Sequence, residues 1–237
     1  MIVTSPTMKQ KQLAFIPARD WPLGKMTKLL AGKPLVWHTL AAAAESNCFS
    51  RIVLFTNSHE VALVGESISD EVLVISKPDY LASKQSTVWN NLWYFLNSEQ
   101  AESMEFDRIA MLLPTSPLRG PRQIQEGLTL LDKSVNSVIG VSKEEYSAET
   151  RLVINEEGWL EDVESPEIFD SQNISAAPSN EYYYPNGSLY AAWRTSLRRH
   201  ASFFKGRVLP YVMDKVSSWR VTSDEDFKLA ELLLSTR

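Results

Sequence analysis

The feature that most constrains the fold is an alternation of short apolar runs with segments of helical periodicity. Leu13 to Pro17 is apolar at every position, which is typical of a strand covered on both faces. From Leu35 to Ala44 apolar residues recur at helical spacing, and Pro34 stands where a first helical turn tolerates proline. Strands that alternate with helices of about a dozen residues predict βαβ units and a parallel sheet with helices on both faces.

The alternation continues along most of the chain. Strands are expected at 51–55, 72–75, 109–113, 137–141, 188–193 and 208–213, and helices at 58–66, 87–96, 123–131 and, capped by Ser223, 224–234. The chain is therefore expected to adopt an α/β fold. Ligands of such sheets bind beyond the carboxyl ends of the strands, so the loops after Pro17, Phe55, Ile75 and Leu113 are the places to search for a site.

The 237 residues suit one globular domain that carries a modest extension. Between Lys143 and Tyr184 acidic residues are dense and apolar periodicity fades. We interpret 143–184 as an insertion in a single domain that spans 1–237.

Composition excludes several classes of protein. A net charge of -5 argues against an extended nucleic-acid footprint, which needs a basic surface. A single cysteine, Cys48, offers neither an intrachain disulfide nor a metal-binding cysteine pair. No stretch approaches the roughly 18 to 20 apolar residues of a membrane helix, and residues 1–12 lack the apolar core of a secretory signal. We therefore expect a cytoplasmic protein without a membrane partner.

Three loops carry residues suited to chemistry. In the first, Arg19, Lys25 and Lys28 surround Gly24, a composition that can wrap a polyphosphate but is equally compatible with a solvated basic turn. The second is Pro114–Arg119, where two prolines fix a rigid turn.

In that second loop Thr115 and Ser116 can bond backbone or ligand, and Arg119 can pair with a carboxylate, with a phosphate or with the protein's own acids. The third loop is a predicted turn at Asn186–Gly187 that precedes a strand. The Asn186 amide can face a sugar or a base, or it can serve the turn alone.

The order of five motifs resembles that of the acylneuraminate cytidylyltransferases, also called CMP-sialic acid synthetases. The motifs are Ile16-Pro17-Ala18-Arg19, Ala31-Gly32-Lys33-Pro34-Leu35, Leu81-Ala82-Ser83, Pro114-Thr115-Ser116-Pro117-Leu118-Arg119 and Pro185-Asn186-Gly187. The likeness covers residues 13 to 234. It implies a three-layer, doubly wound, mostly parallel sheet of the nucleotide-diphospho-sugar transferase type, and a homodimer whose partner reaches in through 143–184.

The implied reaction is attack by a keto-sugar acid on the α-phosphate of CTP, with release of pyrophosphate. The resemblance gives Arg19 and Lys28 a catalytic, phosphate-binding role. It implies nucleotide contacts from Ala18, Arg19, Gly24, Lys25, Lys28, Lys77 and Ser86, and contacts to the sugar acid from Thr115, Ser116, Arg119 and Asn186. Lys77 stands where the family usually has arginine, which keeps the charge and loses the bidentate geometry.

The sequence also departs from the family pattern. Leu23 replaces a loop lysine, Leu113 a glutamine and Tyr184 an arginine. Where the family has two aspartates that hold magnesium, this chain has Arg220 and Thr222. Magnesium is thus expected from the resemblance while its ligands are not retained, because an arginine repels the metal and attracts the triphosphate.

Two alternatives to an active transferase follow from the residues. One is a catalytically impaired, nucleotide-binding paralogue, which the replaced aspartates favour. The other is a dinucleotide-dependent oxidoreductase, which the absence of a Gly-x-Gly-x-x-Gly turn after the first strand disfavours.

Overall fold

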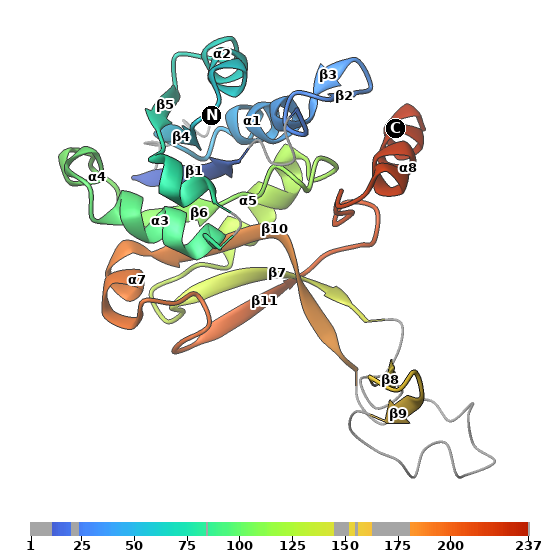
Figure 1. The fold of residues 1–237 in the computed structure, drawn as a ribbon. Coiled ribbons are helices and arrows are strands. Elements are labelled where there is room, and N and C mark those ends of the chain that lie inside the picture. Colours follow the sequence, from blue (N-terminus) through green and yellow to red (C-terminus); the bar gives the residue numbers. More distant parts are fainter. Residues whose placement is uncertain are drawn as a thin grey trace, which may run out of the picture.

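A seven-stranded sheet forms the centre of the molecule in a computed structural model that describes residues 11–19, 24–83, 85–144, 152–154, 156–162 and 181–236 (Figure 1). The strand order is β11-β7-β10-β6-β1-β4-β5. These strands are β1 (Gln12–Ala18), β4 (Arg51–Thr56), β5 (Val72–Ser76), β6 (Arg108–Met111), β7 (Ser137–Lys143), β10 (Tyr183–Trp193) and β11 (Val208–Val212).

Helices connect most of these strands. They are α1 (Leu35–Glu45), α2 (His59–Glu66), α3 (Val88–Leu96), α4 (Glu99–Ser103), α5 (Pro121–Thr129), α7 (Arg194–His200) and α8 (Asp224–Ser235). Two small antiparallel sheets accompany them, β2 (Leu29–Leu30) with β3 (Lys33–Pro34) and β8 (Leu152–Ile154) with β9 (Leu160–Asp162). A 3₁₀ turn, η1 (Asp79–Ala82), follows β5.

The large sheet is mostly parallel, as predicted. Strand β1 pairs in parallel with β4 and β6, β4 with β5, and β7 with β11. Strand β10 runs antiparallel to both of its neighbours, β6 and β7. The carboxyl ends of β1, β4, β5 and β6 therefore meet at one edge of the sheet, where ligands of such folds bind.

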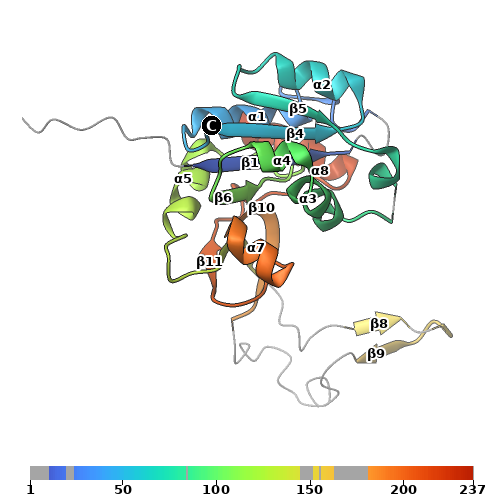
Figure 2. The ribbon, with the colours of Figure 1, turned by 90° about the vertical axis from the view of Figure 1, so that its left-hand side faces the viewer.

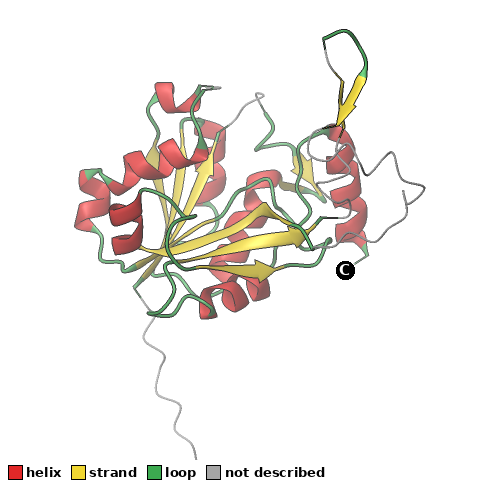
Figure 3. Ribbon diagram, turned by 90° about the horizontal axis from the view of Figure 1, so that it is seen from below, coloured by secondary structure: helices red, strands yellow, loops and turns green. Residues whose placement is uncertain are grey.

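Alternate side chains of the central strands enter two separate cores. Ala14 and Ile16 of β1 pack in the core that takes the buried residues of α1, α2, α5 and α8. Leu13 and Phe15 pack in the other, with α3, α4 and α7. Figure 2 shows α3, α4 and α7 in front of the strands, and Figure 3 shows helices on both sides of the sheet. The predicted three-layer α/β architecture is confirmed.

Side-chain caps explain where several helices begin. The hydroxyl oxygens of Ser58, Thr87 and Ser223 accept hydrogen bonds from the backbone N–H groups three residues ahead. A cap satisfies an N–H that has no partner within the helix. The predicted starts at 58 and 87 are thus caps of α2 and α3, while the predicted start of the last helix at 224, with Ser223 as its cap, is confirmed.

The predictions miss one strand boundary that matters for the site. Strand β10 begins at Tyr183 rather than at Ser188, so Asn186–Gly187 lies inside a strand rather than in a turn before it. Pro185 pairs with Val141 and Tyr190 with Ile139, which leaves a bulge of β10 between them. Polar residues in the bulge hid the strand, because strand patterns show as apolar runs or strict alternation.

Other differences concern short elements. Helices α4 and α7 and the β2–β3 pair were not predicted, since such short segments carry too little periodicity. Most of the predicted insertion, 143–184, lies outside the described residues, so its role as an inserted dimerisation segment stays a prediction. None of the described helices combines the length and the apolarity that a membrane crossing demands.

Candidate functional site at the carboxyl edge of the sheet

The first predicted loop leaves β1 at Ala18, which is fully buried, and the described chain resumes at Gly24. Gly24 has a φ of 81°, and its carbonyl accepts hydrogen bonds from the Lys28 N–H at 2.9 Å and from the Thr27 hydroxyl at 3.3 Å. This left-handed conformation favours glycine and tightens the loop. Leu23, a predicted departure from the family pattern, lies outside the described residues.

Arg19 and Lys77 form a cation pair at this edge. Arg19 follows β1 directly, and its Nη1 donates to the Ser83 carbonyl at 2.7 Å. Lys77 follows β5 directly, and its side chain is buried, with the whole residue 3% exposed. Burial, and after it the guanidinium of Arg19, lowers the pKa of Lys77 to about 8. No carboxylate among the described residues offsets this effect, so an anion placed here would relieve it.

Ser86 lies beside the Arg19–Lys77 pair. Its N–H donates to the same Ser83 carbonyl at 3.2 Å, and its hydroxyl accepts from Nδ2 of Asn91 at 3.2 Å. Asn91 is buried in α3 and also donates to the Thr87 carbonyl at 2.8 Å. The helix thereby holds the segment that carries Ser86. Asn91 was not predicted, because one asparagine within a helix has no spacing signal.

Lys25 and Lys28 lie at the start of α8, a contact that spans nearly the whole chain. Nζ of Lys28 is 2.7 Å from the Asp224 carboxylate and 4.5 Å from the centre of the Phe227 ring. Nζ of Lys25 donates to the Thr222 carbonyl at 3.2 Å. A hollow of about 600 Å³ opens between the loop and the helix.

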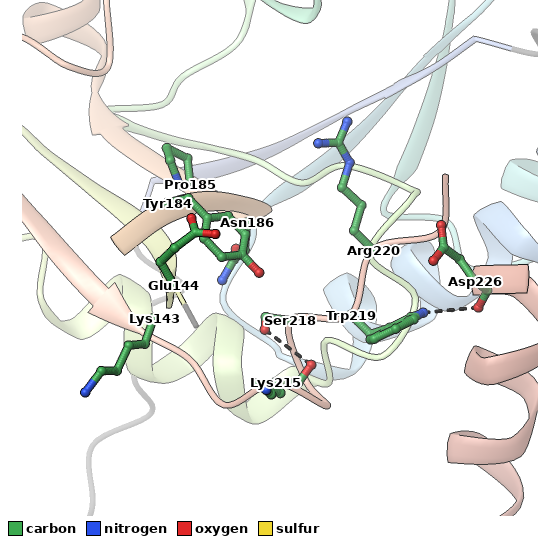
Figure 4. Close-up of a pocket in the computed structure, with 10 residues that line it drawn as sticks. All are labelled: Lys143, Glu144, Tyr184, Pro185, Asn186, Lys215, Ser218, Trp219, Arg220 and Asp226. Atoms are coloured by element: carbon green, nitrogen blue, oxygen red, sulfur yellow. Dashed lines mark hydrogen bonds between the residues drawn. The ribbon is translucent and has the colours of Figure 1, made fainter. Parts of the chain in front are cut away.

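Arg220 is the third cation of this region. Burial, and after it the Arg220 guanidinium, lowers the pKa of Lys25, so these two side chains lie near each other. Arg220 is exposed, and Figure 4 shows its side chain extended from the chain without a bond to the other residues drawn. It forms no hydrogen bond or ion pair with any residue that the structure describes. We call Lys25, Lys28 and Arg220 the α8 cation cluster.

The residues predicted to bind the nucleotide thus fall into two groups. Arg19, Lys77 and Ser86 lie together, and Lys25 and Lys28 lie together with Arg220. Among the described residues, no hydrogen bond or ion pair joins the two groups. The expectation that Arg19 and Lys28 hold one triphosphate stays a prediction.

Asn186 is buried in the bulge of β10, at the wall of a cavity of about 430 Å³ (Figure 4). Its Oδ1 accepts from the Ser188 N–H at 2.9 Å, and its Nδ2 donates to the Ser142 hydroxyl at 3.1 Å. The Ser142 hydroxyl donates in turn to that of Ser218 at 2.8 Å. This chain of bonds ties β10 and β7 to the segment that carries Arg220. Ser142 and Ser218 were missed, since isolated serines give no pattern.

The Pro114–Arg119 segment contacts the bulge of β10 and the chain next to Arg220. Ser116 and Arg119 are fully buried, and Nη1 of Arg119 donates to the Ser188 carbonyl at 2.6 Å. Burial lowers the pKa of Arg119 to about 9. Nε and Nη2 of Arg119 and the hydroxyl of Ser116 have no hydrogen-bond partner among the described residues. Half-buried Thr115 accepts the N–H of Val221 at 2.7 Å through its carbonyl, so this segment also supports the chain next to Arg220.

The residues near α8 do not fit a magnesium ion. Oδ2 of Asp226 accepts from the N–H groups of Thr222 and Ser223, both at 2.8 Å, and from the Thr222 hydroxyl at 2.5 Å. These bonds, that of the Thr222 hydroxyl foremost, lower the pKa of Asp226 to about 2. Asp224 is held by Lys28. The described part of the chain contains no group of three acidic, histidine or cysteine side chains suited to a metal.

Comparison with known proteins gives relatives along nearly the whole chain. A family model described as cytidylyltransferase matches residues 23–225. The chain is 32% identical over 226 residues to the CMP-N,N'-diacetyllegionaminic acid synthase of Legionella pneumophila, and the match covers 94% of this chain and 95% of that protein. It is 28% identical over 230 residues to the N-acylneuraminate cytidylyltransferase of Escherichia coli, where it covers 94% of this chain but only 52% of the relative.

Two solved structures share the fold. The 4-diphosphocytidyl-2C-methyl-D-erythritol synthase of Anaerococcus prevotii superposes with a TM-score of 0.66 at 14% identity, covering 96% of this chain and 100% of that one. The CMP:2-keto-3-deoxy-manno-octonic acid synthetase complexed with CTP superposes with a TM-score of 0.65 at 16% identity, covering 96% of this chain and 99% of that one. At such identities the likeness concerns the architecture alone.

Proposed function

The chain belongs to the cytidylyltransferase family, and from that premise we propose that it transfers CMP from CTP to a sialic-acid-like keto-sugar acid. The similarity to the Legionella synthase over nearly the full length of both proteins carries the proposal. In this reaction the anomeric hydroxyl oxygen attacks the α-phosphorus of CTP and a new P–O bond forms. The bond to the β-phosphate breaks, pyrophosphate leaves, and the hydroxyl proton passes to solvent.

The nucleotide side of the proposed site rests on the Arg19–Lys77 pair. Phosphoryl transfer needs positioning and neutralisation of charge more than covalent chemistry from the protein. Arg19 and Lys77 are two adjacent cations at the edge where ligands of such sheets bind, and Ser86 lies beside them. Ala18 and Gly24 bracket the loop, and Lys25 and Lys28 extend the positive surface toward α8.

The acceptor side of the proposed site is the cavity beside Asn186. Thr115 and Ser116 belong to its support, and we assign Arg119 a positioning role through the Ser188 carbonyl, because its side chain is buried. Asn186 reaches the wall of the cavity while its amide is bonded within the protein. Contact between Asn186 and the acceptor would therefore use the lone pairs and hydrogens that these bonds leave over.

We also propose a cytoplasmic homodimer. The single cysteine suits a reducing compartment. The β8–β9 hairpin within the predicted insertion exposes apolar side chains, which is typical of an interface.

A pyrophosphate-release assay tests the reaction. The protein is supplied with CTP and a panel of nine-carbon keto-sugar acids, with and without magnesium, and pyrophosphate is measured with a coupled enzyme. We expect release with at least one acid and CTP, and none with ATP or GTP. The Arg19→Gln variant should lose most of this activity, because it removes one cation of the pair. The Arg199→Gln variant removes an exposed charge from α7, outside the proposed site, and should retain this activity.

Failure of every acid while the folded protein still binds CTP would reject the transferase and favour the catalytically impaired paralogue. Equal turnover with CTP and ATP would reject cytosine as the base.

A further inference from the structure

The segment that leads into α8 carries Arg220 at the place where a magnesium site would need a carboxylate. We propose that Arg220, assisted by Lys25, binds the polyphosphate of the nucleotide directly, so that nucleotide binding by this chain does not require a divalent cation. The inference rests on the proposed function, since it takes the ligand to be a nucleoside triphosphate.

Two of the three carboxylates in the first turn of α8 are already engaged by the protein, and the third, Glu225, is exposed. Asp226 accepts three hydrogen bonds from Thr222 and Ser223 through a single oxygen and closes the capping box of α8. Asp224 forms an ion pair with Lys28 at 2.7 Å. Magnesium binds through carboxylates together with substrate phosphates, and it sheds its water reluctantly. A metal here would have to break a cap or an ion pair, and Arg220 would repel it.

The three cations differ in how far each is free to bind a phosphate. Lys28 is paired with Asp224, which reduces its attraction for another anion. Lys25 donates to a neutral carbonyl, and the carboxylates of Asp226 and Asp224 each act on it more weakly than the Arg220 guanidinium does. Arg220 bonds to no described residue, and its planar guanidinium suits bidentate binding of phosphate oxygens. Arg220 and Lys25 are therefore the pair that an incoming polyphosphate would meet.

The backbone on both sides of Arg220 is fixed, which prepares the side chain for a ligand. The next residue, Val221, is buried and donates its N–H to the Thr115 carbonyl at 2.7 Å. The preceding residue, Trp219, donates its indole N–H to the Asp226 carbonyl at 3.1 Å (Figure 4). A cation on an anchored segment loses less entropy on binding than one on a mobile loop.

Calorimetric titration of CTP into the metal-free protein tests the inference. With EDTA present we expect saturable binding of CTP, and addition of magnesium should change Kd by less than about threefold. The Arg220→Gln variant should raise Kd in EDTA by about tenfold, which is the effect of one lost charge-assisted hydrogen bond. Arg199→Gln removes the same charge from an exposed site on α7 and should leave Kd unchanged.

Two further variants keep the test decisive. Arg220→Lys retains the charge and loses the planar fork, so its Kd should lie between those of the wild type and Arg220→Gln. The double variant Arg220→Asp with Thr222→Asp should bind CTP well only when magnesium is present. Melting curves of all variants, followed by circular dichroism, check that each is folded.

The outcomes separate the two proposals. Binding of CTP by the wild type only when magnesium is present, or equal affinities of the Arg220→Gln and Arg199→Gln variants, would overturn the inference and leave the proposed function standing. No binding of CTP under any condition would overturn both.

Discussion

At the residue scale, Lys77 shows how burial sets the chemistry of one side chain. Its ammonium lies at the sheet edge next to the Arg19 guanidinium, and its pKa is lowered to about 8, by burial first and by that neighbour second. The free site therefore begins to lose this positive charge just above neutral pH. A bound phosphate would favour the protonated form, because opposite charges raise the pKa of a lysine.

Nucleotide affinity is therefore expected to fall as pH rises. Between pH 7 and pH 9 the ammonium of free Lys77 passes from mostly charged to mostly neutral, so Kd for CTP should weaken by up to about tenfold. Calorimetric titration at several pH values measures the effect. Lys77→Arg stays protonated over this range and should give a flat profile. A wild-type profile as flat as that of the variant would show that Lys77 does not contact the phosphates.

Arg119 illustrates a second effect of burial on a single residue. Its guanidinium is fully buried and donates to the Ser188 carbonyl at 2.6 Å. Enclosing a charge is unfavourable, but removing its side chain leaves a buried carbonyl without a partner. These two contributions have opposite signs, and we expect the orphaned carbonyl to dominate because it holds the bulge of β10.

The Arg119→Met variant is accordingly expected to lose about 1–3 kcal/mol of unfolding free energy, the range for an unsatisfied buried group. Urea unfolding followed by tryptophan fluorescence measures the loss. Arg199→Met, a change at an exposed position of α7, should stay within about 0.5 kcal/mol of the wild type. If the two variants unfold at the same urea concentration, the hydrogen bond from Arg119 to the Ser188 carbonyl does not stabilise the protein.

At the element scale, the bulge of β10 places Asn186 at the wall of the cavity. Gly187 makes the bulge possible with a φ of 81°, and a Cβ at this position would lie 3.2 Å from Cδ1 of Leu113. Bulges turn a strand and redirect its side chains, often next to active sites. Asn186 is thus positioned by a bulge within strand β10 and not by the turn that was predicted before the strand.

We predict that Gly187→Ala lowers stability by about 1–2 kcal/mol, the strain of a left-handed alanine, and raises KM for the sugar acid. Gly32→Ala is the matched control, because Gly32 has a φ of 77° but its Cβ would meet nothing within 4 Å. That variant should show similar backbone strain with an unchanged KM. Steady-state kinetics and urea unfolding provide the two readouts. An unchanged KM for Gly187→Ala would show that the bulge does not contribute to binding of the sugar acid.

At the scale of the whole molecule, the β8–β9 hairpin raises the question of assembly. A two-stranded hairpin is marginally stable by itself in water. Here Ile154, Trp159 and Leu160 are 73%, 68% and 67% exposed. Apolar side chains gathered on so small an element are expected to be covered by another surface. A second copy of the chain provides one, in agreement with the homodimer that we propose.

Sedimentation analysis should therefore give a mass of about twice the 26.8 kDa of one chain. The double variant Ile154→Ser with Trp159→Ser should sediment as a monomer, because it removes the two most exposed apolar side chains of the hairpin. Leu63→Ser, a comparable change on α2 where the side chain is 51% exposed, should remain dimeric. A monomeric wild type would reject the dimer.

The layers of the fold and the edge where the site lies follow from local sequence patterns. The apolar run at the start of β1 and the helical spacing within α1 report which faces are buried, and burial depends on local periodicity. Ser58, Thr87 and Ser223 mark the helix starts, because a cap needs only neighbouring backbone. From these features a doubly wound fold and its basic first loop could be predicted.

The partners of the site residues, in contrast, depend on contacts between segments that are distant in the sequence. Lys28 meets Asp224, Arg119 meets Ser188, and Arg220 lies near Lys25, all between segments remote in sequence. Periodicity reports which face a residue occupies and carries no information on what lies opposite. Whether a cation is neutralised, buried or free to bind phosphate depends on that partner. The electrostatics of the site therefore depend on how α8 and β10 pack and cannot be predicted from periodicity.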